Sequence, residues 1–316
     1  MQPVDSTTIW RLTDGKVGDR VQCAGVAAAL GGEAKEMIIA PAPVFAWAAP
    51  WGPIDWRHAP DRPGSPIAPP FPDILIASGR RAAPYARVVK KESGGRTFVA
   101  FLKDPRVTAS FADLIWTPAH DKRRGAKVFT TLTAPHGLAA AIRDWAVKAP
   151  AATADLPGPI LGLVLGGPSG GARYDLSAAD QLCDEVAKAM GAFGSIAVTP
   201  SRRTPKLFEA RVRECLSVFP GFVWEGSGRN PYLEILGRGD ALIVAGDSHN
   251  MVSEAAASSA GVYVWRPEGM AKKLRWFLDA MKEKGRVRDF AGDATPFDAE
   301  SMDATREIAD EIRRRR

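Results

Sequence analysis

Two polar loops in the second half of this 316-residue chain combine the residue types that hold phosphate groups. Residues 165–171 contain four glycines and follow an apolar run, so their backbone N–H groups could cradle a pyrophosphate, although Pro168 removes one donor. Residues 199–205 follow the next apolar run and add hydroxyl and guanidinium groups. Neighbouring parallel strands end at the same sheet edge, so the two loops predict one anion site. Its candidate ligands are Gly166, Gly167, Ser201, Arg202 and Arg203.

A third polar loop, residues 245–254, runs from a predicted strand into a predicted helix. Ser248, Asn250 and the free N–H groups of the helix start, up to Met251, could hold a phosphate. Glu254 lies one turn into the helix and could reach the hydroxyls of a sugar or ribose. The same pattern also fits a capping box, in which Asn250 caps the helix and a later residue only reciprocates. We expect the ligand role, because three polar loops would then converge on one pocket.

In the first half, residues 13–20 join the first predicted strand to a helix over residues 21–30. Asp14 and Lys16 lie among glycines here, and the helix start offers N–H groups and a partial positive charge to an anion. The lysine lacks the spacing and the following Ser or Thr of a P-loop. We expect Asp14 and Lys16 on the substrate side. Asp19 could act as a general base or could simply cap the helix, and the residue types leave both roles open.

Two further loops of the first half carry charged groups directly after predicted strands. Arg80 and Arg81 form a guanidinium pair that suits phosphate or carboxylate, although one of them could instead be a structural ion-pair partner. His120 beside Asp121 resembles an oriented general base. A loop histidine that only satisfies backbone carbonyls is the alternative. We therefore expect an anion site at Arg80 and Arg81 and treat His120 as a second candidate catalytic residue.

Short apolar runs alternate with helix-type periodicity along the whole chain, which favours parallel sheets with crossover helices. Strands are predicted at residues 8–12, 74–78, 97–102, 113–117, 128–131, 160–165, 195–199, 222–224, 241–245 and 262–265. Helices are predicted at residues 138–148, 178–190, 205–216, 231–237, 251–259 and 270–284. The pattern predicts an α/β protein of two Rossmann-like domains with parallel sheets, facing a cleft.

A stretch rich in proline and small residues, 149–159, marks the expected domain boundary. It divides the chain into an N-terminal domain, residues 1–152, and a C-terminal domain, residues 153–316. The tail over residues 299–316 has a helical pattern that ends in four arginines, whose charges suit the helix dipole. We leave open whether this terminal helix packs back on the N-terminal domain.

Composition narrows the classes of partner. Hydrophobic residues make up 46% of the chain and charged residues 25%, as in ordinary soluble globular proteins. The net charge of +6 favours anionic partners, but no zinc-finger spacing or RNA-binding aromatic pattern is present, so we expect no nucleic acid. The three cysteines are far apart in the chain, which argues against disulfides and structural zinc and for a reducing compartment.

One uncharged segment, residues 37–54, nominally reaches the length needed to span a membrane, but its prolines would break a helix. Trp47, Trp51 and Trp56 lie in or beside it, which leaves open a shallow contact with a membrane interface. Packing of a buried loop is the simpler expectation. The first residues show no secretory signal pattern. We expect a cytoplasmic protein and leave open a peripheral contact with the inner membrane.

The same loops resemble the mitochondrial-fission "elongated mitochondria" family of plants, which has many bacterial homologues. The resemblance covers almost the whole chain, and its motifs are specific only in combination. They are residues 12–18 with Gln22, 79–81, 104–106, 120–121, 201–205, 230–232, 247–248 and 251–254.

This family is similar in fold to GT-B glycosyltransferases. The resemblance implies that the second domain binds a nucleotide-diphosphate sugar and the first domain an acceptor, with no metal or other cofactor. Asp19 stands where related membrane-associated sugar transferases place a histidine. The implied activity is a metal-independent, inverting glycosyltransferase. A non-catalytic nucleotide-binding or scaffold protein at a membrane surface is the alternative, and a nucleotide-sugar epimerase is a weaker third.

Overall fold

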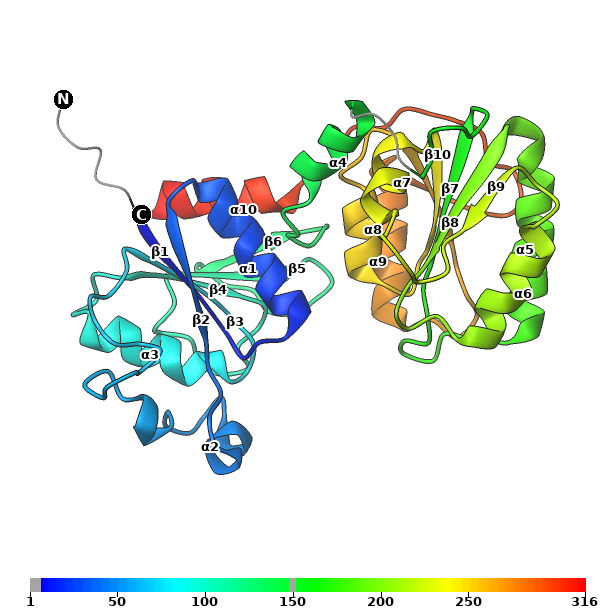
Figure 1. The fold of residues 1–316 in the computed structure, drawn as a ribbon. Coiled ribbons are helices and arrows are strands. Elements are labelled where there is room, and N and C mark those ends of the chain that lie inside the picture. The colour runs from blue at the N-terminus through cyan, green and yellow to red at the C-terminus, as the bar shows by residue number, and fades with distance from the viewer. Residues whose placement is uncertain (1–6, 148–151) are drawn as a thin grey trace, which may run out of the picture. The chain divides into compact units, whose positions relative to one another are not determined.

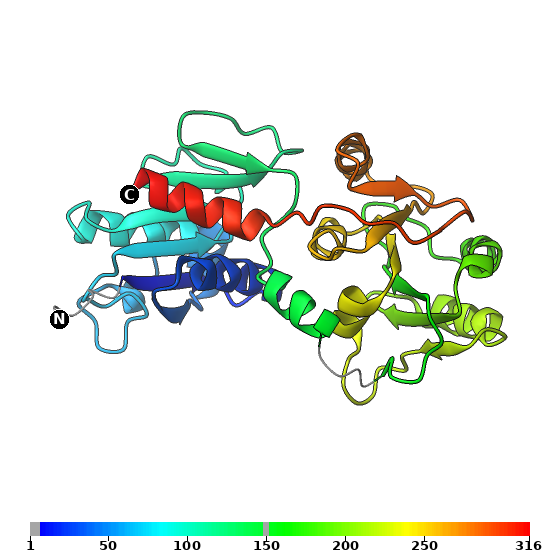
Figure 2. The ribbon, with the colours of Figure 1, turned by 90° about the horizontal axis from the view of Figure 1, so that it is seen from above.

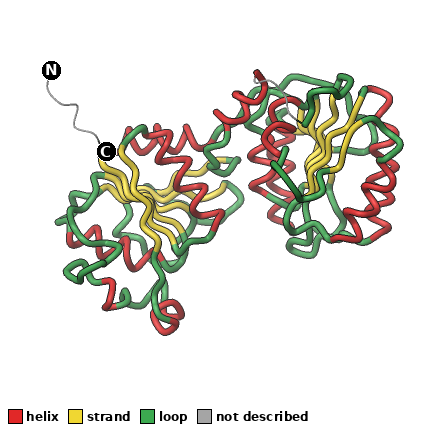
Figure 3. The backbone as a smooth tube through the Cα atoms, viewed as in Figure 1, coloured by secondary structure: helices red, strands yellow, loops and turns green. Residues whose placement is uncertain are grey.

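The computed structural model describes residues 7–147 and 152–316, which form two compact units (Figure 1). Within these residues, the first unit holds 7–137 and 304–316, and the second holds 138–147 and 152–303. Each unit has one sheet of six parallel strands with helices on its faces (Figure 3). The expected α/β class with two Rossmann-like sheets is therefore confirmed.

The first unit has strand order β2-β1-β3-β4-β5-β6. Its strands are β1 (Thr8–Thr13), β2 (Glu33–Ile38), β3 (Ile74–Ser78), β4 (Phe98–Leu102), β5 (Leu114–Pro118) and β6 (Val128–Thr131). Its helices are α1 (Val17–Leu30), α2 (Pro43–Ala48), the 3-10 turn η1 (Trp56–His58), α3 (Ala82–Glu92) and α10 (Ala304–Arg315).

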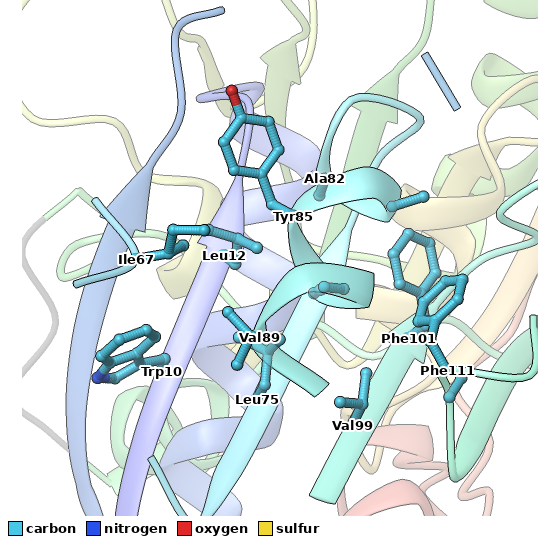
Figure 4. Packing of buried hydrophobic residues seen from close by; sticks show 14 of the residues in the cluster. Trp10, Leu12, Ile67, Leu75, Ala82, Tyr85, Val89, Val99, Phe101 and Phe111 are labelled. Atoms are coloured by element: carbon cyan, nitrogen blue, oxygen red, sulfur yellow. The ribbon is translucent and has the colours of Figure 1, made fainter. Parts of the chain in front are cut away.

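Both faces of this sheet are buried, as crossover helices on a parallel sheet require. On one face, Trp10, Leu75 and Phe101 of the strands pack with Tyr85 and Val89 of α3 (Figure 4). The alternation of strand side chains sends the neighbouring residues to the opposite face. That face is covered by α1 and α10.

The C-terminal helix α10 belongs to the first unit (Figure 2). Its Ile308 and Ile312 pack with Val26 of α1 and Ile76 of β3, so the end of the chain completes the core of its first half. The backbone N–H of His136 donates to Thr305 Oγ1 at 3.0 Å, which fixes the start of α10.

The second unit has strand order β12-β11-β10-β7-β8-β9. Its strands are β7 (Ile160–Leu165), β8 (Ser195–Pro200), β9 (Gly221–Val223), β10 (Ala241–Ala245), β11 (Gly261–Trp265) and β12 (Val287–Asp289). Its helices are α4 (Ala139–Val147), α5 (Leu176–Ala189), the 3-10 turn η2 (Met190–Ala192), α6 (Lys206–Leu216), α7 (Tyr232–Arg238), α8 (His249–Ala255) and α9 (Lys272–Glu283).

The division between the units differs from the expected break after residue 152. Helix α4 packs against α7, so the chain passes into the second unit after Gly137. Composition could not show this, because α4 precedes the proline-rich stretch. Residues 148–151 of that stretch lie outside the described residues. Among the described residues, no helix is both long and apolar enough to cross a bilayer.

Two strands, β2 and β12, and two α-helices, α2 and α3, were not predicted. Strand β2 is largely exposed and polar, and α2 begins at Pro43, where proline's missing N–H costs nothing in the first turn. Strand β12 has only three residues. Helix α3 has a basic last turn that interrupts its apolar pattern. Helix α1 also begins at Val17, one turn earlier than expected, so Asp19 lies inside its first turn.

Candidate functional site

Each sheet has one point where the strand order reverses, and ligands of doubly wound proteins bind beside such points. In the second unit β7 lies between β10 and β8, so the loops after β7 and β10 flank the reversal. In the first unit β1 lies between β2 and β3, so the loops after β1 and β3 flank it. These four loops, together with the helices α1 and α8 that follow two of them, hold most of the predicted site residues.

In the second unit the reversal point is filled by a network around the fully buried Asp247. Its carboxylate accepts hydrogen bonds from the Tyr174 hydroxyl, from the Gly167 N–H at 3.3 Å and from the Arg203 guanidinium at 3.0 Å. A Cβ on Gly166 would stand 1.8 Å from Asp247 Oδ1, so only glycine fits there. The glycine-rich loop, predicted to cradle a pyrophosphate, thus binds the protein's own carboxylate.

Beside this network, a cavity of about 580 Å³ lies beyond the carboxyl ends of β8 and β9 and next to α8. Its volume is in the range of pockets for ligands of nucleotide size. Its hydroxyl, cationic, aromatic and acidic lining comes from Ser201, Arg202, Lys206, Trp224, Tyr232 and Glu254. We take this cavity as the candidate ligand site of the second unit.

Two cations line the cavity. Arg202 is exposed and makes no ion pair within the described chain, so its guanidinium is available to an anion. Lys206 Nζ lies 2.9 Å from Glu209 Oε2, and Arg213 lies 3.2 Å from the other oxygen of the same carboxylate. Arg213 also lies 3.2 Å from Glu225, so Lys206 and Arg213 are balanced by two carboxylates, and the unpaired positive charge at the cavity is that of Arg202.

The acidic side of the cavity is formed by Glu254, which is hydrogen-bonded to Tyr232. The Tyr232 hydroxyl donates a hydrogen bond to Glu254 Oε2. Burial raises the pKa of Glu254, although this hydrogen bond opposes the shift. The other carboxylate oxygen accepts no hydrogen bond within the described chain, so it can take one from a ligand hydroxyl. Trp224 is half-buried and adds an indole that could stack on a planar ring.

Only part of the predicted donor set lines this cavity: Ser201, Arg202, Met251 and Glu254 do, whereas the glycines, Arg203, Ser248 and Asn250 do not. Ser248 is the N-cap of α8, since its side chain accepts from the Met251 N–H at 3.4 Å. The alternative interpretation with Asn250 as cap is therefore wrong, and Asn250 is exposed.

Sequence reasoning missed Trp224 and Lys206 as cavity residues, and Tyr232 only took part in the family resemblance. Trp224 directly follows β9, at the edge where ligands bind, so its position carried the signal. A single tryptophan after a strand is more often a core side chain than a ligand contact, so its residue type alone did not indicate a site. Lys206 begins α6 and was hidden by the more conspicuous arginine pair before it.

The reversal point of the first unit holds two carboxylates that face one glycine. A Cβ on Gly79, whose φ is +97°, would stand 3.2 Å from Asp19 Oδ2 and 3.6 Å from Asp14 Oδ1. Asp19 Oδ1 accepts from Lys103 Nζ at 2.6 Å and from Ser78 Oγ at 3.0 Å. The two acids, from the loop after β1 and the first turn of α1, thus lie within a few ångströms of the same empty Cβ position.

The two carboxylates differ in their partners. Asp19 is held by Lys103 and Ser78, so it is neither a helix cap nor an unengaged base. The Asp14 side chain is 1% exposed and neither oxygen accepts a hydrogen bond within the described chain. Its nearest cations are Lys16 at 3.1 Å and Arg81 at 3.8 Å. Asp14 is therefore the less satisfied acid.

Lys103 carries backbone strain. Its φ of 74° is in the left-handed region, which residues other than glycine rarely adopt. Its N–H donates to the Trp116 carbonyl at 2.7 Å, which ties the residue to β5. Strain of this kind persists only where the surroundings enforce it, and it concentrates at functional sites. Lys103 was not among the predicted site residues.

Arg80 has a structural role instead of the predicted anion site. Its guanidinium donates to the carbonyls of Ala49 at 2.8 Å and Ala46 at 3.0 Å. Arg81 stays at the reversal point beside Asp14. His120 Nε2 lies 3.9 Å from Asp121 Oδ1, which is too long for the expected oriented base.

No group of three or more His, Cys, Asp or Glu side chains that could hold a metal ion exists among the described residues. The structure therefore offers no protein-made metal centre within that part of the chain. Cys23 is buried in α1, and burial raises the pKa of its thiol, which makes it unreactive.

Comparison with solved structures supports the fold. The chain is similar to a UDP-GlcNAc 2-epimerase from Methanocaldococcus jannaschii, with 11% identity, a TM-score of 0.51 and coverage of 97% of this chain and 99% of that one. It also resembles MurG of Acinetobacter baumannii, with 12% identity, a TM-score of 0.44 and coverage of 98% and 91%. The similarity to the epimerase supports the expected fold of two Rossmann-like domains with parallel sheets.

Comparison of sequences gives the family. The chain is 28% identical over 276 residues to the mitochondrial fission protein ELM1 of Arabidopsis thaliana, a match that covers 77% of this chain. The match spans 64% of the length of that relative. The model of the mitochondrial fission ELM1 family matches residues 17–316. This chain therefore belongs to the mitochondrial fission ELM1 family.

Proposed function

We propose that the protein is a metal-independent, inverting glycosyltransferase whose second unit binds a nucleotide-diphosphate sugar. The observation that carries the proposal is the cavity beside β8, β9 and α8, which combines cations, an indole and a partly buried carboxylate. These are the groups that a nucleotide sugar needs: positive charge for the diphosphate, an aromatic face for the base and an acceptor for ribose or sugar hydroxyls.

The roles follow from the contacts. The unpaired guanidinium of Arg202, with Lys206, would neutralise the diphosphate and stabilise it as it leaves with the electron pair of the glycosidic bond. The free oxygen of Glu254 would accept from a hydroxyl, while Tyr232 holds the other oxygen in place. Trp224 would stack on the base.

The first unit would bind the acceptor at its reversal point. Of its two carboxylates, Asp14 is the better candidate base, since Asp19 is engaged by Lys103 and Ser78. Asp14 would take the proton of the acceptor hydroxyl while that oxygen attacks the sugar. This changes the initial assignment of Asp19 as the base to that of a positioning residue.

A second candidate is a nucleotide-binding protein that acts at a membrane surface without turnover. The Arabidopsis relative is named as a fission protein, and this chain exposes a cluster of tryptophans. An epimerase is the third candidate, because a solved UDP-GlcNAc 2-epimerase shares the fold. Product analysis separates the three: a transferred sugar, an epimerised sugar or no product.

Thermal unfolding with UDP, GDP, ADP and their sugars tests the binding step. A ligand at 100 times its dissociation constant stabilises the folded state by about 2.7 kcal/mol, which raises the melting temperature by several degrees. Trp224→Ala and Arg202→Ala should lose the shift. Asn250→Ala, at an exposed position outside the cavity, is the matched control and should keep it. If no nucleotide shifts the wild-type protein, the proposal is wrong.

Turnover is tested separately on a protein that binds. Asp14→Asn should keep nucleotide affinity and remove transfer to acceptor, and EDTA should change neither. Transfer by Asp14→Asn at the wild-type rate would exclude Asp14 as the base. Loss of transfer on adding EDTA, restored by a divalent cation, would exclude the metal-independent mechanism.

A further inference from the structure

One short segment of the first unit, residues 42–58, exposes an unusual set of apolar side chains. Val44 is 64% exposed, Trp47 80%, Trp51 69% and Trp56 63%. Of the four exposed tryptophans among the described residues, three fall in this segment, and Trp276 in the second unit is the fourth. The simpler sequence expectation, a buried loop, is therefore wrong, and we call residues 42–58 the tryptophan segment.

Two arginines hold the tryptophan segment in place through hydrogen bonds to its backbone. The Arg80 guanidinium donates to the carbonyls of Ala46 and Ala49, at the end of α2, and Arg87 donates to the Pro50 carbonyl at 3.2 Å. Both guanidinium groups donate hydrogen bonds to backbone carbonyls, and these bonds anchor the segment on the α3 side of the unit. In Figure 1, α2 lies at the lower edge of the first unit.

Asp55 closes the segment into a compact loop. The carboxylate is fully buried and accepts from the Ala42 N–H at 2.9 Å, which ties the start of α2 to η1. It also accepts from the Arg57 N–H at 3.1 Å and pairs with the Arg57 guanidinium. The Arg57 guanidinium, with the N–H groups of Ala42 and Arg57, holds the pKa of Asp55 well below its usual range, so the carboxylate stays charged at neutral pH.

Rigid exposure of three tryptophans has a physical consequence. A flexible loop could turn such side chains inward, but here the backbone that carries them is fixed at both ends and in the middle. The uncovered apolar surface is therefore a permanent feature of the folded chain, and patches of this kind mark interaction surfaces. Tryptophan is the side chain that concentrates at the boundary between lipid and water.

The charge of the molecule is divided unequally between the two units. The sequence of the first unit, residues 1–137 and 304–316, contains 23 Lys and Arg against 15 Asp and Glu. The second unit, residues 138–303, contains 19 against 21. The excess of positive charge thus belongs to the unit that carries the tryptophan segment. Arg62 stands over the Trp56 ring, with its guanidinium carbon 5.8 Å from the ring centroid.

We propose that the tryptophan segment is the surface through which the first unit docks on an anionic lipid bilayer. The indoles and Val44 enter the headgroup region, and the net positive charge of the unit holds it against the negative surface. A neutral protein partner would match the apolar side chains but would leave the positive excess uncompensated. The proposal is independent of any nucleotide chemistry in the second unit.

Vesicle sedimentation of the full chain tests the proposal, with phosphatidylcholine alone or mixed with phosphatidylglycerol. The wild-type protein should bind the mixed vesicles, less strongly at high salt. The double variant Trp47→Ala/Trp51→Ala should bind about tenfold more weakly, since two large apolar contacts are lost. The control Trp276→Ala, an exposed tryptophan on α9, should bind like the wild type. Equal binding by the double variant and the wild type would overturn the proposal.

A second readout guards against indirect effects. Vesicles with brominated acyl chains should quench the tryptophan emission of the wild type, and the double variant should lose most of that quenching. The variant should keep its melting temperature, because both side chains are exposed. A wild-type dimer in light scattering that the double variant abolishes, without vesicle binding, would assign the surface to a second copy of the chain and refute the lipid docking.

Discussion

Each of the two reversal points of the molecule contains a buried aspartate, but the two carboxylates differ in their hydrogen bonding. In the second unit Asp247 is surrounded by Tyr174, Arg203 and the Gly167 N–H, and the space beside Gly166 is filled. In the first unit Asp14 is equally buried but accepts no hydrogen bond within the described chain. The protein's own donors satisfy the carboxylate of Asp247. The carboxylate of Asp14 can still accept hydrogen bonds from a ligand.

The difference shows where each unit can meet a ligand. A saturated carboxylate stabilises the fold, so the proposed ligand site of the second unit is the cavity to one side of the reversal, at the ends of β8 and β9. An unsatisfied buried carboxylate costs stability and persists where function needs it. The strained backbone of Lys103 beside the first reversal point agrees with this interpretation.

Asp247→Ala should give the largest loss of stability. It removes a buried charge that holds a tyrosine, an arginine and a backbone N–H, and leaves these donors unpaired. We expect a loss of about 3 kcal/mol in the free energy of unfolding, measured by urea denaturation. Asp184→Ala, at an exposed position on α5, is the control and should change it little. A similar small loss for both variants would mean that the network does not stabilise the second unit.

Arg80→Ala should come next, since it removes donors from carbonyls at the end of α2. We expect a loss of about 2 kcal/mol. Vesicle binding should weaken as well, because the tryptophan segment loses its anchor, whereas nucleotide binding by the second unit should not change. If Arg80→Ala weakens nucleotide binding and leaves the vesicle binding intact, the arginine is an anion ligand after all.

Asp14→Asn should change stability by less than about 1 kcal/mol, because it loses only ion pairs with the exposed side chains of Lys16 and Arg81 and no hydrogen bond to the carboxylate. Asp247→Asn is the matched variant in the other unit and should lose more, since an amide accepts less well from Arg203. Urea denaturation of the pair measures the contrast directly. A larger loss for Asp14→Asn would reverse the assignment of saturated and unsatisfied sites.

Glu254→Gln should have the smallest effect and one that depends on pH. Burial raises the pKa of Glu254 in the folded state above its unfolded value near 4.5. Its stabilising contribution is therefore complete below pH 4.5 and is lost as the pH rises through the folded pKa. The glutamine variant stays neutral, so its stability relative to the wild type should increase over that interval. Urea denaturation across this pH range checks it, and a constant difference would show that Glu254 is not buried as described.

Much of the fold followed from local patterns. Apolar runs of five or six residues identified the central strands, because parallel strands are buried on both faces. The strands at the edges of the sheets were harder to predict. Strand β2 is exposed and charged, so it lacks the apolar pattern of a buried strand. The position of α4 depends on its packing against α7, a contact that no local pattern contains.

The candidate site was predictable in its loops and less so in its side chains. Position after a strand correctly located Ser201, Arg202 and Glu254 beside a cavity. It could not show that Arg203 and Arg80 bind groups of the protein itself. The sequence does not distinguish an arginine that binds a carboxylate or carbonyl of its own chain from a free one. The approach of Asp14 and Asp19 to Gly79 depends on contact between two segments that are distant in the chain.

Photolabelling with an azido derivative of the nucleoside diphosphate that binds tests the central claim most directly. After irradiation and proteolysis, mass spectrometry locates the labelled peptides on the intact chain. We expect label on the walls of the second unit's cavity, at residues 199–206, 224–232 or 251–254, and competition by the unmodified nucleotide. Competed label at residues 14–19 or 79–81 instead, with none around the cavity, would contradict it.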